Sequence, residues 1–308
     1  MFREGKGTPV LGIYSGAVKP LFAFLPFLAL PLLAERQPLV FDINWVNPPA
    51  VKPAGVQHLV LRSASMQRDV GYNVYLPPDY ERSGKRYPVI YWLHGAGGNE
   101  SSTLWVAEEY QKAIAAGLTE PAILVFPNGG RRTEYRDWKP QNVMPETMII
   151  RELIPHIDAT FRTIATPAGR SLEGMSMGAN GALKLAFKYP ELFHSVVAYA
   201  GSYKRLPLDG YFPGISVEQQ AWIAKLQQWW SAEDDVFELA HHNSARLGEL
   251  RIRLVIGSKD VAFEDSEALH PWLRARGIPH EYEILLGVSH DTKAYYARSG
   301  AHGFRFHF

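Results

Sequence analysis

The chain has 308 residues, of which 46% are hydrophobic and 20% are charged. This is the composition of an ordinary globular protein and excludes disordered and fibrous classes. The absence of cysteine excludes disulfides, thiolate metal sites and a cysteine nucleophile. With 32 basic and 31 acidic residues the net charge is +1, so the sequence offers no electrostatic footprint for a nucleic-acid partner.

An apolar run dominates the N-terminal part of the chain. Leu21–Ala34 reads LFAFLPFLALPLLA, which is shorter than the roughly 20 residues of a membrane-spanning helix, so no stable span is expected. Basic residues precede the run and a small residue ends it, as in a secretory signal peptide. We therefore expect residues 1–34 to direct export, to the periplasm or the medium; if they are a buried segment instead, the protein is cytoplasmic. Residues 35–55 contain four prolines and are predicted to form a linker.

The following stretches alternate between strand and helix patterns. His58–Arg62 and Tyr72–Leu76 are short β-branched or aromatic stretches and predict an antiparallel pair of strands. Tyr87–Leu93 and Pro121–Pro127 are continuous apolar runs, which are typical of strands buried on both faces. Between these two runs, Ser101–Ala116 has helical spacing, with one of its first two serines as the N-cap.

The alternation continues to the C-terminus. Pro145–Phe161 is predicted to be an amphipathic helix that Pro155 kinks. The later elements are predicted, in order, as strand Arg170–Gly174, helix Ala179–Tyr189, strand Ser195–Ala200, strand Arg251–Ile256, helix Glu264–Gly277, strand Glu281–Leu286 and helix Asp291–Ser299. This pattern predicts an α/β fold in residues 56–308, with a mostly parallel central sheet covered by helices on both faces.

Residues 203–250 interrupt this rhythm. They contain Trp222, Trp229 and Trp230, and the spacing from Val217 to Trp230 is helical. An insertion at this place would lie over the carboxyl ends of the strands, where open α/β sheets bind ligands. We expect it either to help shape a substrate pocket near the active site or to be an extra packing helix.

The stretch from Gly174 to Gly178, GMSMG, matches the pattern G-x-S-x-G. It lies between a predicted strand and a predicted helix, which is the context of a nucleophile elbow. Such a turn leaves no room for side chains at the two glycine positions and strains the serine backbone. The hydroxyl then projects beside a helix N-terminus, which favours developing negative charge. Ser176 is therefore the predicted nucleophile.

A serine hydroxyl needs a base, and the base needs a carboxylate that orients it. Proteins with this elbow carry the three groups in the chain order serine, acid, histidine. Asp260 follows the predicted strand Arg251–Ile256, and His290 follows the predicted strand Glu281–Leu286. Because parallel strands end at one edge of the sheet, we expect both side chains to meet Ser176 there.

Other acids and histidines are weaker candidates for these roles. Glu264 or Asp265 could replace Asp260 as the acid. Among the histidines, His280 precedes its strand and His270 lies within a predicted helix. His241 and His242 lie in the insertion.

The small-residue stretch HGAGG directly follows the first buried strand. With an elbow, one oxyanion donor is the backbone N–H of the residue after the nucleophile, here Met177, and the other comes from such an early loop. We expect Ala96 to be the second donor, or else Gly95, with His94 part of the same loop. A dinucleotide-binding loop is disfavoured, because Glu100 occupies the position of its third glycine.

Patterns for other chemistries do not occur. The sequence contains neither H-E-x-x-H nor G-x-x-x-x-G-K-[ST], so we expect no metal and no cofactor. Glu173 precedes the elbow on a strand that should be buried, which predicts a structural role in holding nearby backbone. A loop containing Arg136, Asp137 and Trp138 either faces the site or forms a surface turn.

Six stretches carry a resemblance to a known family. In chain order they are YPVIYWLHGAGG, FPNGG, PETMIIRELIPHIDATFR, RSLEGMSMGANGALKLAFKYPELF, LVIGSKD and GIPHEYEILLGVSHD. Through them the chain from about Gly71 to Ala297 resembles the esterase family that includes feruloyl esterases, esterase D and mycolyltransferases. The resemblance implies an α/β-hydrolase fold, a triad of Ser176, Asp260 and His290, and hydrolysis of carboxylic esters without a cofactor.

These observations lead to a serine ester hydrolase that forms an acyl-enzyme. The resemblance and the aromatic insertion favour feruloyl or acetyl esters of polysaccharides, or small esters, as substrates. The alternative is an acyltransferase that passes the same acyl group to an alcohol. A binding module without activity would not need all three groups at one edge. The sequence leaves the oligomeric state open.

Overall fold

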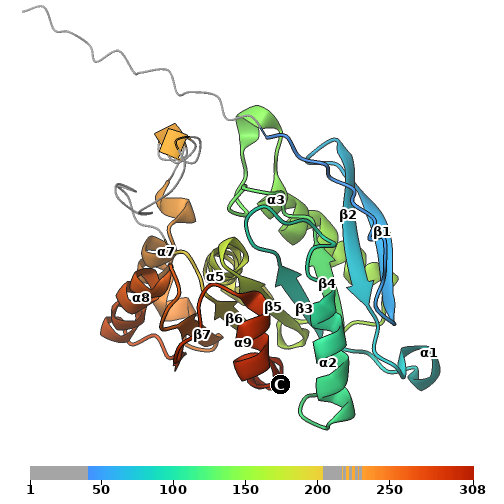
Figure 1. Cartoon of the computed structure of the whole chain (residues 1–308). Helices are drawn as coiled ribbons and strands as arrows, with labels where there is room; N and C mark the ends of the chain where they lie inside the picture. The colour runs from blue at the N-terminus through green and yellow to red at the C-terminus, as the bar shows by residue number, and fades with distance from the viewer. Residues whose placement is uncertain (1–40, 204–216, 218–219, 222–223, 226–227, 229–230) are drawn as a thin grey trace, which may run out of the picture. The chain divides into compact units, whose positions relative to one another are not determined.

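A mixed β-sheet forms the centre of the protein (Figure 1). The computed structural model describes residues 41–203, 217, 220–221, 224–225, 228 and 231–308, all within one unit that spans Arg36–Phe308. In the described residues the sheet has eight strands, in the order β1-β2-β4-β3-β5-β6-β7-β8. They are β1 (Val56–Ser63), β2 (Arg68–Tyr75), β3 (Val89–Leu93), β4 (Ile123–Pro127), β5 (Arg170–Met175), β6 (Ser195–Tyr199), β7 (Arg251–Gly257) and β8 (Glu281–Leu285).

The sheet is antiparallel at one end and parallel elsewhere. β1 pairs with β2, and β2 pairs with β4, in antiparallel register. All pairs from β4 through β3, β5, β6 and β7 to β8 are parallel. β3 to β6 are fully buried, which agrees with their continuous apolar runs. The predicted α/β class is therefore confirmed, and the carboxyl ends of β3, β5, β7 and β8 lie at one edge.

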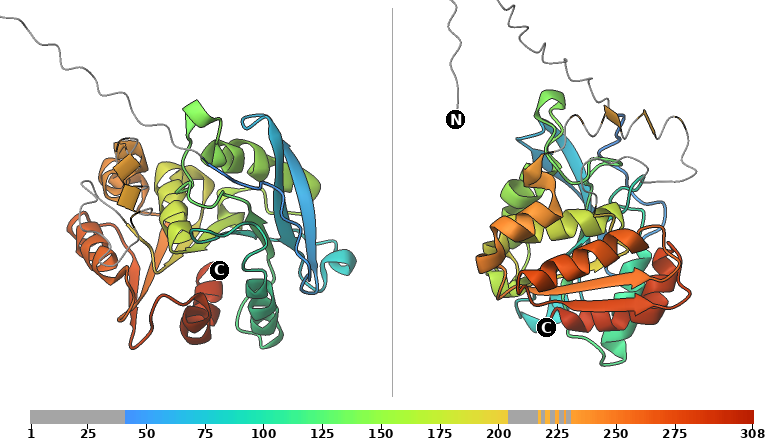
Figure 2. Two further views of the ribbon diagram at one scale, coloured as in Figure 1. Left: turned by 45° about the horizontal axis from the view of Figure 1, so that its top comes forward. Right: turned by 90° about the vertical axis from the view of Figure 1, so that its left-hand side faces the viewer.

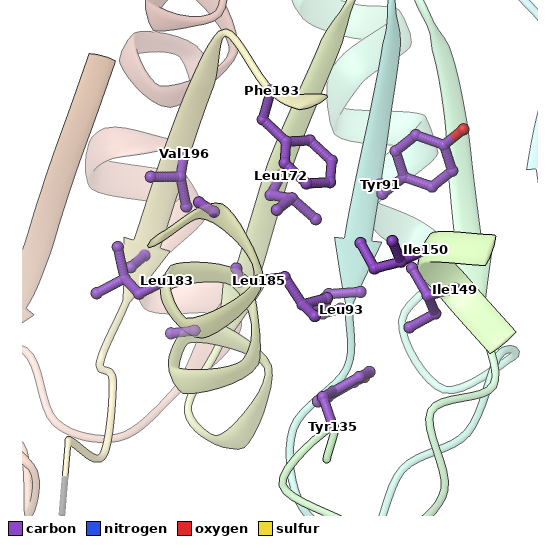
Figure 3. Close-up of a cluster of buried hydrophobic side chains, with 14 of the residues drawn as sticks. Tyr91, Leu93, Tyr135, Ile149, Ile150, Leu172, Leu183, Leu185, Phe193 and Val196 are labelled. Atoms are coloured by element: carbon purple, nitrogen blue, oxygen red, sulfur yellow. The ribbon is translucent and has the colours of Figure 1, made fainter. Parts of the chain in front are cut away.

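Helices cover both faces of the sheet (Figures 1 and 2). One face packs against α4 (Ile154–Thr160), α5 (Met177–Lys188), α7 (Val236–His242) and α8 (Phe263–Ala275). The other packs against α2 (Trp105–Ala115), α9 (Thr292–Tyr295) and α10 (Ala301–Phe306). Figure 3 shows the first core, where Leu183 and Leu185 of α5 meet Leu172 and Val196 of the strands. Burial of these apolar surfaces on both faces holds the strand ends in place.

Short helices complete the described chain. The remaining α-helical turns are α1 (Tyr80–Ser83) and α3 (Pro145–Thr147), and π-helical turns occur at η2 (Met148–Leu153) and η7 (Tyr296–Gly300). The 3₁₀ turns are η1 (Lys139–Gln141), η3 (Pro167–Gly169), η4 (Pro190–Leu192), η5 (Ala232–Asp234) and η6 (Ser244–Arg246).

The start of one predicted helix differs from the structure, and the helix that contains Pro155 includes a π turn. The helix expected from Ser101 begins only at Trp105, and neither Ser101 nor Ser102 is its N-cap. Ser101 Oγ instead donates to the carbonyl of Asn47, at 2.5 Å, so the serine ties two distant segments together. The helix interrupted by Pro155 remains continuous but widens into the π turn η2, in which the N–H of Ile154 reaches the carbonyl of Ile149. Proline lacks an N–H, and a π turn is one way a helix accommodates that loss.

The segment that precedes β1 contacts the domain over several residues. Trp45 is buried, and Phe41 and Ile43 pack against the first core. The carbonyl of Trp45 accepts a hydrogen bond from Gly71 N–H, at 2.6 Å. This part of the predicted linker 35–55 therefore packs against the domain.

Two predictions concern residues outside the described ranges. The apolar run Leu21–Ala34 lies within residues 1–40, which the structure does not describe. Most residues of the helical pattern Val217–Trp230 are not described either. Of the predicted insertion, the structure describes mainly residues 231–250, where α7 packs against α5 and α8. None of the helices that are described is long and apolar enough for a membrane span.

Candidate active site

The nucleophile elbow is formed where β5 turns into α5. Ser176 has φ 59° and ψ −120°, a conformation that L-residues rarely adopt and that stores strain. A Cβ on Gly174 would collide with the backbone of Gly178, and a Cβ on Gly178 would collide with the carbonyl of Leu93. Both glycines of G-x-S-x-G are thus required by close backbone approach, and the turn leaves Ser176 partly exposed.

The structure brings Ser176 together with His290 and Asp260. His290 Nε2 lies 3.0 Å from Ser176 Oγ. His290 Nδ1 lies 2.9 Å from Oδ1 and 3.0 Å from Oδ2 of Asp260. The three side chains come from the loops that follow β5, β7 and β8, which is the arrangement expected from their chain order.

The Asp260 carboxylate determines which nitrogen of His290 carries the proton. A carboxylate only accepts hydrogen bonds, so Nδ1 is the protonated nitrogen. Nε2 then has a free lone pair, and the hydroxyl of Ser176 donates to it. The side chain of Asp260 is fully buried, whereas that of His290 is 34% exposed, so a substrate can reach the imidazole but not the carboxylate.

The loops after β7 and β8 are joined by backbone hydrogen bonds. Ser258 N–H donates to Leu285 carbonyl, and Lys259 N–H donates to Val288 carbonyl, each at 3.0 Å. Gly257 allows this approach, because a Cβ there would collide with the carbonyl of Val288. The acid and the imidazole are therefore positioned by one shared piece of backbone.

Tyr295 also contacts this group, although no sequence pattern pointed to it. Its hydroxyl donates to Asp260 Oδ2 at 2.8 Å and accepts from Gly257 N–H at 2.6 Å. Ala262 N–H donates to Asp260 Oδ1 at 2.8 Å. Both oxygens of the carboxylate therefore accept hydrogen bonds. Because the acceptor is charged, these bonds are stronger than hydrogen bonds between neutral groups.

The loop HGAGG lies beside the elbow. A Cβ on Gly95 would be 3.6 Å from Ser176 Cβ, so this backbone borders the serine. Within the described part of the chain, the N–H groups of Gly95, Ala96 and Met177 donate to no other protein atom. These three groups are the predicted oxyanion donors, and they remain free to bind an incoming oxygen.

His94 holds this loop but does not face the reaction site with a free nitrogen. Its Nδ1 donates to the carbonyl of Gly95 at 2.9 Å, and its Nε2 accepts from Gly129 N–H at 3.1 Å. Burial lowers the pKa of His94 to about 4, so the imidazole is neutral at neutral pH. His94 therefore holds in place the backbone that carries the N–H groups of Gly95 and Ala96.

Tyr135 supports the same loop from below, as Figure 3 shows beneath Leu93. Its hydroxyl donates to the carbonyl of His94 at 3.0 Å. Glu134 and Tyr135 both have positive φ, 55° and 51°, and buried Lys184 donates to both of their carbonyls. The strained turn is thus stabilised by a cation that caps its backbone.

The other candidates lie elsewhere. His270 Nδ1 and His280 Nε2 bind each other, at 2.8 Å. Glu173 is fully buried, as expected, but its carboxylate binds the side chains of Tyr296 and His307 and not nearby backbone. Trp138 is buried, so the loop around it is not a surface turn.

The described residues also contain a pocket outside this site. A surface pocket of about 510 Å³ lies at the opposite sheet edge, before β5, β6 and β7, with Pro167, Phe193 and Leu250 in its lining. In the described ranges no group of three or more His, Asp or Glu residues could hold a metal ion.

Comparison with protein families and curated sequences gives matches to esterases. The profile of the family described as "Putative esterase" matches residues 63–307. An esterase of Mycobacterium tuberculosis is 40% identical over 134 residues, which are 42% of this chain and 29% of the esterase. An endo-1,4-beta-xylanase/feruloyl esterase of Xylanibacter ruminicola is 33% identical over 167 residues, 49% of this chain and 21% of that protein. The chain therefore spans less than a third of the length of these relatives.

More distant similarity extends to a transferase and to solved structures. The diacylglycerol acyltransferase/mycolyltransferase Ag85A of Mycobacterium bovis is 26% identical over 198 residues, 59% of this chain and 54% of that protein. A solved ferulic acid esterase superposes with a TM-score of 0.71 at 23% identity, covering 82% of this chain and 96% of that one. An S-formylglutathione hydrolase from Agrobacterium tumefaciens gives a TM-score of 0.64 at 17% identity, covering 82% and 94%. These structures share the α/β-hydrolase fold with this chain.

Proposed function

The chain belongs to the "Putative esterase" family, and on that premise we propose that it is a serine carboxylic ester hydrolase whose catalytic residues are Ser176, His290 and Asp260. The observation that carries the proposal is the continuous hydrogen-bonded series from Ser176 Oγ through His290 to Asp260. A nucleophile, a base and an orienting acid within bonding distance are what acyl transfer requires.

The reaction follows from the tautomer of His290. Nε2 takes the proton of Ser176 as Oγ attacks the ester carbonyl, and Asp260 stabilises the resulting imidazolium. The negative oxygen of the tetrahedral intermediate binds the N–H groups of Met177 and Ala96, or Gly95 in place of Ala96. Each such donor contributes about 3 kcal/mol of transition-state stabilisation.

The intermediate then collapses to an acyl-enzyme. The proton on His290 Nε2 moves to the leaving alcohol, which departs. Water then enters and gives a proton to the same nitrogen as its oxygen attacks the acyl carbonyl. The bond from the carbonyl carbon to Ser176 Oγ breaks, the proton on Nε2 returns to Oγ, and the acid leaves. The 34% exposed side chain of His290 leaves room for the alcohol and the water to reach Nε2.

We propose feruloyl or acetyl esters of polysaccharides as the substrate class. The similarity to a xylanase/feruloyl esterase supports this class. A panel of methyl ferulate, acetylated xylan and p-nitrophenyl esters of increasing chain length tests it. Turnover of the p-nitrophenyl esters alone would contradict the polysaccharide part of the proposal while leaving the ester hydrolase intact.

Replacement of the nucleophile gives the direct test. Ser176→Ala should lower kcat for p-nitrophenyl acetate by about 10⁶-fold, with unchanged thermal stability, and a fluorophosphonate probe should label Ser176 only. Ser171→Ala is the matched control, because Ser171 lies on the same strand but bonds Ser195, at 2.8 Å. Near-wild-type activity of Ser176→Ala would refute the assignment.

An acyltransferase is the second candidate, favoured by the similarity to a mycolyltransferase. The acyl-enzyme would be the same, and an alcohol would replace water as the acceptor. Product analysis with and without a sugar or glycerol acceptor separates the two: a transferase accumulates the new ester, whereas a hydrolase releases free acid in both cases.

A further inference from the structure

Two adjacent tyrosines follow the histidine loop and reach two different buried carboxylates. Tyr295 ends α9 and Tyr296 begins η7. The hydroxyl of Tyr295 donates to Asp260, at 2.8 Å, whereas the hydroxyl of Tyr296 donates to Glu173. Both rings are buried. The pair therefore offers a comparison within one turn of helix, since only one of the two carboxylates belongs to the proposed reaction site.

The hydrogen-bond direction at Tyr295 is fixed by its second partner. Gly257 N–H donates to the phenolic oxygen at 2.6 Å, so the single hydroxyl proton is left for Asp260 Oδ2. Burial, and then the Asp260 carboxylate, raise the pKa of Tyr295. The hydroxyl thus stays protonated and remains a donor throughout the pH range in which a histidine titrates.

The remaining titratable groups near Tyr295 do not compete for this role. Tyr199 lies edge-on to it, with 6.1 Å between ring centroids, and Tyr203 and Tyr282 are close enough to interact with it electrostatically. Burial raises the pKa of each of these three tyrosines. Asp260 and, beyond it, His290 are therefore the groups near Tyr295 whose charge matters at neutral pH.

We propose that Tyr295 is a positioning residue for the reaction: its hydroxyl holds the Asp260 carboxylate in the plane that His290 Nδ1 needs and withdraws part of its negative charge. This inference rests on the proposed function of Ser176, His290 and Asp260. Without the tyrosine, Oδ2 would lose its only donor besides His290 among the described residues. The carboxylate could then rotate, and it would bind the imidazolium more strongly.

The test compares Tyr295→Phe with Tyr296→Phe. Loss of a hydrogen bond to a charged group should lower kcat of Tyr295→Phe by about 10- to 100-fold with little change in KM. Because the carboxylate becomes more electron-rich, it should stabilise the protonated imidazole of His290 more strongly. The acid limb of the pH profile of kcat/KM should therefore move to higher pH. Tyr296→Phe should lower thermal stability and leave that limb in place.

NMR of protein with ¹⁵N-labelled histidine follows the His290 titration directly, even without ester turnover. A raised pKa of His290 in Tyr295→Phe alone supports the inference. An unchanged titration, or the same change in both variants, overturns it. Failure of the proposed function has a different signature, in which the wild-type protein neither hydrolyses esters nor reacts with a fluorophosphonate at Ser176.

Discussion

A histidine belongs to each of the two loops beside Ser176, and the two histidines have different hydrogen-bond partners. On the imidazole side, His290 binds a buried carboxylate, that of Asp260, and leaves one nitrogen for the serine. On the side of the HGAGG loop, both nitrogens of His94 bind backbone groups. One histidine is therefore equipped to gain and lose a proton, and the other to remain neutral and hold a loop.

The difference follows from what surrounds each ring. His94 is buried without a carboxylate partner, so burial lowers its pKa to about 4. His290 is 34% exposed and paired with Asp260, a partner that stabilises the protonated ring. Burial with neutral partners thus distinguishes a structural histidine from the proposed base. The two sides should respond differently when their partners are changed.

The largest expected effect is on the imidazole side. Asp260→Asn should lower kcat by about 10⁴-fold, because an amide can favour the His290 tautomer that carries its proton on Nε2, where no base is then available. Asp158→Asn is the matched control, since Asp158 is a carboxylate bonded to Arg170 and Thr163 away from the site. Steady-state kinetics on both variants, with circular dichroism for the fold, check this; equal losses in the two would contradict the assignment of the acid.

A smaller effect, on stability, is expected on the loop side. The pKa of His94 is about 4 in the fold against 6.5 as its ordinary value, so below pH 6.5 the unfolded chain binds a proton that the folded chain does not. The contribution of the neutral imidazole to the free energy of unfolding is therefore complete above pH 6.5, and it is lost as the pH falls toward 4. Between pH 7 and pH 5 this amounts to about 2 kcal/mol.

Urea unfolding at the two pH values measures that effect. His94→Gln keeps a donor and an acceptor but cannot titrate, so its free energy of unfolding should fall less than that of the wild type, by about 2 kcal/mol, over the same interval. Equal losses would mean that folding does not lower the pKa of His94. The comparison of the two histidines would then be wrong.

The sequence predicted the parts of this site that depend on position along a strand. Ser176, Asp260 and His290 each follow a parallel strand, and parallel strands end at one edge, so their meeting can be expected from local patterns. Tyr295 and Tyr135 could not be found in this way. Each reaches its partner, Asp260 or His94, from a distant segment through one hydroxyl, and a single tyrosine leaves no periodic signal.

The helix ends show the same limit. Ser101 has the residue type of an N-cap and the correct spacing, but a tertiary bond to Asn47 uses its hydroxyl, and the helix begins later. Local propensity was outweighed by a contact with a segment that the sequence assigned to a linker. Apolar periodicity thus determined the order of strands and helices, whereas the polar contacts between loops required the structure.

The smallest expected effect concerns the hydroxyl of Tyr135. Tyr135→Phe removes one neutral hydrogen bond to the carbonyl of His94, so kcat/KM should fall by about 10-fold, the equivalent of about 1.4 kcal/mol. Tyr110→Phe is the matched control, because it removes a buried hydroxyl bonded to another carbonyl, that of Glu120, at 2.6 Å. Its loss should lower stability without changing kcat/KM. If the two variants behave alike, the loop beside Ser176 does not depend on Tyr135, and the backbone bonds of His94 alone hold the oxyanion donors in place.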